Sequence, residues 1–221
     1  MSNFMELYHL LNRGVDKRDI VLDDSDRARF IHDLFAFNDA DIVLHISQAA
    51  RRKEILKPHR KLLVYIHAFS LMNNHYHLLV SEVLDGGISL FMQKMNMGYA
   101  KYFNERYERT GTLWQGKYKK VLIERDAHFM YIPYYVHLNP LDFTMPEWRD
   151  GKVKDPREAL RQLRDYRWSS HLDYLGVRNF QSITHRALLT EILGTPQHYE
   201  AEIVSLITDP KVAIKSSVIE N

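Results

Sequence analysis

The hydrophobic pattern of the first 140 residues switches between the two-residue period of strands and the longer period of helices. Residues 62–71, "LLVYIHAFSL", are almost wholly apolar, which is typical of a buried strand, and we expect this strand to continue to about residue 81. Phe30, Leu34 and Phe37 recur at helical spacing after Ser25, a residue suited to cap a helix. In chain order, the pattern predicts a strand at 5–12, a helix at 25–38, a short helix at 46–56, a strand at 62–81, a turn at 85–87, a helix at 88–109, a strand pair or an extended stretch at 112–124 and a helix at 126–140.

The pattern changes after Pro140. Residues 141–157 are rich in proline, aspartate and glycine, and predict a loop. Short helical patterns follow at 156–165, 168–175, 185–193 and 196–208. Strands separated by helices, and then a run of short helices, predict an α+β fold with a small helical C-terminal region. We therefore expect a main domain at 1–140 and a helical extension at 141–221 packed on it.

Composition narrows the class of protein. Hydrophobic residues make up 45% and charged residues 26%, as in a globular domain. No apolar run approaches the length of a transmembrane helix, and "MSNFMELYHLLNRG" lacks the features of a signal peptide. Cysteine is absent, which excludes disulfides, thiolate zinc sites and cysteine nucleophiles. These features predict a cytoplasmic protein that does not enter a membrane.

The net charge is only +2, and the distribution of charged residues is more informative about possible ligands. Basic clusters lie at 51–53 ("RRK"), 57–61 ("KPHRK") and 117–120 ("KYKK"), and the chain carries thirteen tyrosines, ten phenylalanines and three tryptophans. Basic clusters with aromatics suit a groove for single-stranded nucleic acid, although each cluster by itself is more often ordinary solvated surface. The candidate contacts to DNA are Arg13, Lys117, Lys119 and Lys120, and the alternative for Arg13 is to cap a neighbouring carboxylate.

Two histidines stand one residue apart in "NNHYHLLV", residues 73–80. Side chains at i and i+2 of a strand point to the same face, so His75 and His77 should lie side by side, with Tyr76 on the opposite face. Two converging imidazoles suit a metal ion. The alternative is that the two rings are simply hydrogen-bonded.

A second group of candidates lies in "YIPYYVHLNP", residues 131–140. On a helix, Tyr131, Tyr135 and Asn139 would line one face, one turn apart. Asn139 offers an amide oxygen that suits Mg²⁺ or Mn²⁺, and Tyr135 is a possible covalent nucleophile. Tyr134 and Tyr131 are its rivals, and Pro133 predicts a kink or a broken first turn.

The order of these motifs resembles that of a known family. "FSLMNNHYHLLV" is similar to the histidine-hydrophobic-histidine (HUH) motif of single-tyrosine transposases, with Tyr76 as its middle residue. "GTLWQGKYKKVLIE", "YVHLNP" and "YRWSSHLDYLG" (166–176) resemble, in the same order, blocks of REP-associated tyrosine transposases, and so does "YHLLNRGVDKRDIVLDDSDRARF" (8–30). The resemblance covers most of the chain, from about residue 8 to residue 176.

The resemblance implies a central antiparallel sheet flanked by helices, of the ferredoxin-like HUH type. It implies that 1–140 is a catalytic domain that cleaves single-stranded bacterial DNA at hairpins formed by REP-like palindromes, in the nucleoid, as a monomer or homodimer. It also implies that His75 and His77 bind Mg²⁺ or Mn²⁺, with Asn139 as third ligand. Tyr135 would attack a DNA phosphate and form a 5′-phosphotyrosine intermediate of transposition and recombination.

Two other functions remain open from the sequence. The same sheet could bind single-stranded nucleic acid without cleaving it. A metal-dependent hydrolase of small phosphoesters would need a base that activates water, and would not need a tyrosine beside the metal. Trp114 and Trp168 also have a structural interpretation, as anchors of the C-terminal helices on the sheet.

Overall fold

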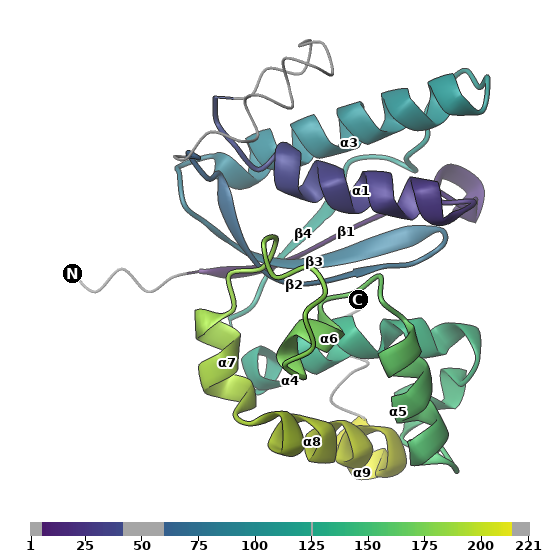
Figure 1. Ribbon diagram of the computed structural model, residues 1–221, viewed down its shortest axis with the longest axis vertical. Coiled ribbons are helices and arrows are strands. Elements are labelled where there is room, and N and C mark those ends of the chain that lie inside the picture. The colour runs from purple at the N-terminus through teal and green to yellow at the C-terminus, as the bar shows by residue number, and fades with distance from the viewer. Residues whose placement is uncertain (1–5, 42–59, 125, 214–221) are drawn as a thin grey trace.

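The computed structural model describes residues 6–41, 60–124 and 126–213. Its centre is a four-stranded antiparallel sheet in the order β2-β3-β1-β4 (Figure 1). The α+β class with an antiparallel sheet, which the sequence predicted, is therefore confirmed. The strands are β1 (Leu7–Arg13), β2 (Val64–Leu71), β3 (His75–Glu82) and β4 (Lys119–Leu122).

Two helices connect the strands and cover one face of the sheet. They are α1 (Asp24–Ala36) and α3 (Gly87–Arg106), which lie side by side above the sheet in Figure 1. With them, the strands follow the order β-α-β-β-α-β of the ferredoxin-like fold. The helix predicted at 46–56 and the basic cluster at 51–53 lie outside the described residues, as does most of the cluster at 57–61.

The single strand predicted for 62–81 is wrong, because the structure has two strands joined by a tight turn. Met72 N donates to His75 O across this turn, and Asn73 O accepts from Ile20 N at 2.7 Å. The apolar run hides the turn because both strands of the hairpin are buried and read as one hydrophobic segment.

The cap of α1 also differs from the prediction. Asp23, not Ser25, is the N-cap, and its side chain accepts a hydrogen bond from Asp26 N. Asp26 is fully buried, and its carboxylate accepts from Leu22 N at 2.8 Å. A carboxylate caps a helix N-terminus as well as a hydroxyl does, and it also carries the charge that this end favours.

The opposite face of the sheet is covered by α4 and the C-terminal elements, which form the lower layer in Figure 1. Helix α4 contains Pro133, as expected. The loop predicted for 141–157 contains two 3-10 helices. The elements are α4 (Asp126–Leu138), the 3-10 helices Asn139–Phe143 and Pro146–Asp150, α5 (Pro156–Asp165), α6 (His171–Tyr174), α7 (Ala187–Leu193), α8 (Pro196–Thr208) and α9 (Pro210–Ala213).

Each face of the sheet has its own hydrophobic core. The first core joins the sheet to α1 and α3, and includes Leu10, Tyr76 and Leu78. The second core joins Leu7 and Leu79 of the sheet to α4 and the C-terminal helices. The strand alternation separates the two sets of side chains. None of the described helices is long and apolar enough to cross a membrane.

The two edges of the sheet differ. The outer edge of β2 is covered by the C-terminal region: Leu71 N donates to Trp168 O, Ser70 forms a bridge with Ser169, and Ile66 forms one with Thr184. Trp168 itself stacks on Phe180, in agreement with an anchoring role. In the described part of the chain no strand pairs with the outer edge of β4, whose residues are exposed.

Candidate active site

The histidine pair lies on the face of the sheet that α4 covers. The register aligns His77 with Leu11 and His75 with Arg13 of β1. The rings of His75 and His77 are perpendicular, with centroids 5.0 Å apart. Tyr76 points to the other face, where its hydroxyl donates to Asn96 Oδ1 at 2.8 Å. The predicted placement of the three side chains is confirmed.

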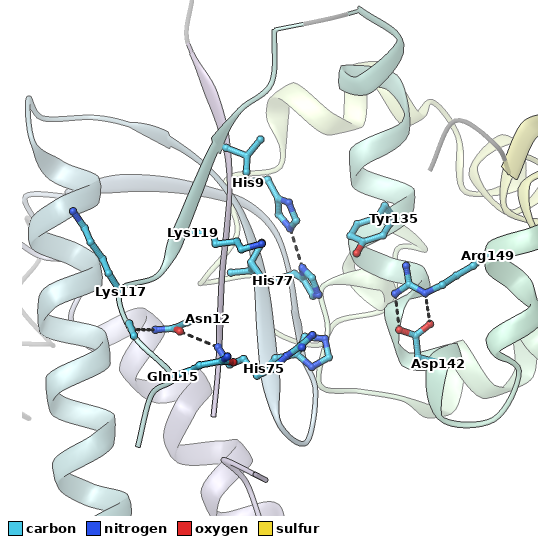
Figure 2. Close-up of a pocket in the computed structure, with 14 residues that line it drawn as sticks. His9, Asn12, His75, His77, Gln115, Lys117, Lys119, Tyr135, Asp142 and Arg149 are labelled. Atoms are coloured by element: carbon cyan, nitrogen blue, oxygen red, sulfur yellow. Dashed lines mark hydrogen bonds and ion pairs between the residues drawn. The ribbon is translucent and has the colours of Figure 1, made fainter. Parts of the chain in front are cut away.

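A third histidine, His9 of β1, belongs to the same group and was not predicted from the sequence. Its Nε2 lies 2.9 Å from Nδ1 of His77, and the two rings are stacked with centroids 5.1 Å apart (Figure 2). Alternation along "YHLLNR" puts His9 on the same face as Arg13, and this was the available signal. The pairing of β1 with β3, which brings His9 to His77, cannot be read from local spacing.

The donor chemistry of His75 and His77 fits a divalent metal ion. Nδ1 of His75 is hydrogen-bonded to the amide oxygen of Asn74 and therefore carries the proton, which leaves Nε2 as the atom for a ligand bond. Nδ1 of His77 is hydrogen-bonded to Nε2 of His9, which also leaves Nε2 of His77 as the atom for a ligand bond. Burial, and then the charges of His9 and His75, hold the pKa of His77 well below its usual value, so its ring is neutral, as a metal ligand must be.

Asn139 is not among the residues that line the cavity with the histidines. Helix α4 ends at Leu138, and the Asn139 amide turns back to donate to Tyr135 O at 2.6 Å, which satisfies a carbonyl at the helix end. Its amide oxygen accepts from Arg149 Nη2 at 3.3 Å. Within the described ranges no group of three or more histidine, cysteine, aspartate or glutamate side chains is arranged to hold a metal ion. The role of Asn139 as third ligand stays a prediction.

Tyr135 is the tyrosine of α4 that lies beside the histidines. Its ring is perpendicular to that of His77, with centroids 5.5 Å apart, and its side chain lines the cavity. Tyr134 instead stacks on Tyr199 in the second core, with centroids 5.5 Å apart. The ring of Tyr131 lies next to that of Tyr135, with centroids 6.3 Å apart, but Tyr131 is not part of the cavity lining. Pro133 thus leaves Tyr135 on the face that the helical spacing predicted.

Arg149 and Asp142 complete the wall of the cavity opposite the histidines, and neither was predicted from the sequence as a site residue. Arg149 Nε donates to Asp142 Oδ1 at 2.9 Å, and Nη2 donates to Oδ2 at 2.6 Å (Figure 2). Burial would lower the pKa of Arg149, but hydrogen bonds and charge interactions with Asp142 and Tyr135 raise it overall. Both residues lie in a segment with no regular hydrophobic period, so the sequence offered no signal for them.

These side chains enclose a cavity of about 520 Å³ between the sheet and α4. Its lining is strongly cationic, because Asp142, the one carboxylate among the described lining residues, is already paired with Arg149. The cations are Arg13, Lys117, Lys119 and Arg149. A cationic cavity with two imidazoles and a phenol suits a phosphate-bearing ligand.

The residues predicted to contact DNA lie in different places in the structure. Arg13 lines the cavity, and its buried Nε has no hydrogen-bond partner among the described residues, where no carboxylate is paired with it. Lys119 points toward His77 in Figure 2, whereas Lys117 extends away from the histidines. Lys120 does not line this cavity: it lies on the other face of β4, with Nζ 4.0 Å from the centre of the Tyr8 ring, and its contact with DNA stays a prediction.

Comparison with known proteins adds the family. No curated protein sequence matches the chain. One similar solved structure, described as "Structure of the REP associates tyrosine transposase bound to a REP hairpin", is 13% identical, with a TM-score of 0.45, and the match covers 80% of this chain and 83% of that one. Residues 37–139, which hold His75, His77 and Tyr135, match the family model described as "Transposase IS200 like". This part of the chain, a little under half of it, is therefore similar to the IS200-like transposase family.

Proposed function

We propose that the protein is a metal-dependent endonuclease and transposase of the REP-associated tyrosine type, which cleaves and rejoins single-stranded DNA at hairpins. The observation that carries this proposal is the position of Tyr135 beside His77 in a cationic cavity. The order of motifs in the sequence supports the subfamily and the hairpin substrate. We expect the protein to act on DNA of the bacterial nucleoid, as a monomer or a homodimer.

His75 and His77 would hold the metal through their Nε2 atoms, and His9 would keep His77 in the required tautomer. When bound, Mg²⁺ or Mn²⁺ would supply a Lewis acid that polarises the phosphate. Arg13 and Lys119 would attract the DNA backbone, because their charges in the cavity are not compensated by a second carboxylate.

Tyr135 would be the nucleophile. Its phenolic oxygen forms a bond to phosphorus while the bond from phosphorus to the 3′-oxygen breaks. The 5′-phosphate of the downstream DNA strand therefore becomes linked to the tyrosine. The proton lost by the phenol is balanced by the proton gained by the 3′-oxygen, which leaves as a hydroxyl. Attack by that hydroxyl on the phosphotyrosine reverses the step and rejoins the DNA.

The second candidate is a hairpin-binding protein without cleavage. The hydrogen bonds of Asn139 favour it, because its amide is engaged by Tyr135 O at the end of α4 and by Arg149, instead of being left for a metal ion. A protein that only binds DNA would not need the metal, so the effect of EDTA distinguishes the two candidates.

The test compares Tyr135→Phe with Tyr134→Phe, a matched control because Tyr134 packs on Tyr199 outside the cavity. Each variant is incubated with single-stranded hairpins and Mg²⁺, and covalent protein–DNA adducts are resolved on a denaturing gel. We expect the adduct with the wild type and Tyr134→Phe, no adduct with Tyr135→Phe or with EDTA, and unchanged hairpin binding in all. An adduct with Tyr135→Phe would disprove the assignment of the nucleophile.

A further inference from the structure

Arg149 is placed in the site by a part of the chain that lies beyond the transposase family match. It belongs to the 3-10 helix Pro146–Asp150, whereas the match ends at residue 139. Its guanidinium group nevertheless lies against Tyr135, with Cζ 5.3 Å from the centre of the ring. The C-terminal region thus contributes a cation at the residue proposed as the nucleophile.

The guanidinium group is held rigidly. Asp142 accepts two hydrogen bonds from it, and Asp142 Oδ1 also accepts from Trp148 Nε1 at 2.6 Å. Trp148 is buried in the second core, and its ring lies under the guanidinium group, 4.8 Å from Cζ. Three donors on one carboxylate fix the plane of the arginine before any ligand binds, which lowers the entropic cost of a new contact.

The orientation of Arg149 directs it at the reacting atoms. Nε and one side of Nη2 are occupied by Asp142, and Nη2 also approaches Asn139. The hydrogen bond between the side chains of Tyr135 and Arg149 contributes to keeping Arg149 protonated. In Figure 2 the guanidinium group lies between Tyr135 and Asp142, on the side of the cavity that faces the histidines. A phosphate placed for attack by Tyr135 would therefore lie beside the guanidinium group.

We propose that Arg149 is a catalytic residue that donates hydrogen bonds to the non-bridging oxygens of the DNA phosphate attacked by Tyr135. This inference rests on the proposed function. The guanidinium group is a planar, cationic fork of N–H donors, and its charge stabilises the negative charge that grows on the non-bridging oxygens as the fifth bond to phosphorus forms. Arg149 keeps its proton throughout, so it does not enter the balance of bonds and protons.

The alternative is that Arg149 only stabilises the 3-10 helix through Asp142. The two roles differ in what a substitution changes. A structural arginine would affect the melting temperature, whereas a phosphate contact would affect the adduct rate at saturating DNA and the salt dependence of binding.

The experiment uses Arg149→Gln, Arg149→Lys and the control Arg157→Gln, which removes an exposed arginine on α5. The first measurement is the single-turnover rate of adduct formation on a hairpin with Mg²⁺. The expected loss is roughly 100-fold for Arg149→Gln, as for the loss of one charged donor to a transition state. Arg149→Lys keeps the charge but loses the fork, so it should recover part of the rate. Arg157→Gln should match the wild type.

The second measurement is the binding of a single-stranded 12-mer in EDTA over a range of salt. Arg149→Gln should weaken binding about tenfold at low salt and reduce the salt slope by about 0.7, whereas Arg157→Gln should not. If the rates and affinities of Arg149→Gln and Arg157→Gln agree within threefold, the inference is overturned. If Arg149→Gln does not fold, Arg149→Lys, which can still pair with Asp142, decides by the same criteria.

The two proposals can fail separately. If the wild type forms no adduct on any hairpin, the proposed function is wrong, and the binding measurement alone then judges Arg149. Equal binding by Arg149→Gln and Arg157→Gln in that case overturns the phosphate contact as well.

Discussion

At the scale of single residues, the alternation of side chains along β4 places Lys119 and Lys120 on opposite faces of the sheet. Lys119 aligns with Leu11, on the face that carries His9 and His77. Lys120 aligns with Leu10, on the opposite face, and lies over the Tyr8 ring. A basic run in the sequence is therefore not one basic patch, because consecutive side chains of a strand leave the sheet on opposite sides.

This difference gives a matched pair of variants. Lys119→Gln should weaken the binding of single-stranded DNA and reduce the slope of log affinity against log salt by about 0.7, the value for one lost phosphate contact. Lys120→Gln removes the same charge from the other face and should leave the slope unchanged. Fluorescence anisotropy with a labelled oligonucleotide over a range of salt measures both. Equal slopes for the two variants would contradict the assignment of Lys119 to the DNA side.

The parts of the site that could be predicted are those set by local periodicity. The pairing of His75 with His77 follows from a spacing of two on a strand, and the choice of Tyr135 over Tyr134 follows from helical rotation. The presence of His9 in the site depends on the pairing of β1 with β3, and that of Arg149 on the path of an irregular segment. Neither can be read from local spacing. The helical spacing also does not predict the hydrogen bond from the Asn139 amide to Tyr135 O, which satisfies a carbonyl in the last turn of α4.

At the scale of elements, Ser170 joins α4 to the sheet. Its Oγ accepts from Phe69 N of β2 at 2.9 Å and lies 2.7 Å from Nε2 of His137 on α4. His137 also contacts the Tyr199 hydroxyl of α8 through Nδ1, at 2.7 Å. These buried hydrogen bonds connect the helix that carries Tyr135 to β2 and α8, and they tie the "WSS" motif to the position of α4.

Ser170→Ala should destabilise the protein by about 1–3 kcal/mol, because it leaves the buried Phe69 N–H and Nε2 of His137 without their partner. Urea unfolding followed by circular dichroism measures the change in free energy. The control is Ser182→Ala, at an exposed serine, which should be close to neutral. The same unfolding free energy for both variants would show that the network contributes nothing measurable.

At the scale of the whole molecule, one sheet separates two cores. The first is completed by α1 and α3, and the second by α4 and the C-terminal helices. The division into 1–140 and 141–221 stays a prediction. In the structure the C-terminal helices share the second core with α4 and also supply Arg149, so we expect the extension to be needed for a formed site.

The second core holds histidines whose charged form is disfavoured, and this predicts how stability depends on pH. Burial lowers the pKa of His67 to about 4 and that of His171 to about 3. The unfolded chain, with values near 6.5, binds protons first as the pH falls, so the free energy of unfolding drops below pH 6.5. The loss at pH 5 is about 2 kcal/mol for each group.

Urea unfolding at pH 7 and pH 5 checks this dependence. His67→Gln should lose about 2 kcal/mol less than the wild type between the two values, because it removes one of the groups that titrate. His198→Gln, at an exposed histidine, controls for the loss of a histidine as such. A wild-type protein with the same unfolding free energy at both pH values would contradict the prediction.

The unequal edges of the sheet limit how copies of this chain can associate through their backbones. An edge with unpaired N–H and C=O groups can join a second sheet, and a molecule with two such edges can be extended without end. Here the C-terminal region occupies the β2 edge, and within the described residues β4 alone presents an edge of this kind. Two copies joined at β4 would have no such edge left among the described strands. Growth by strand addition would therefore stop at a pair and would not continue into a fibre.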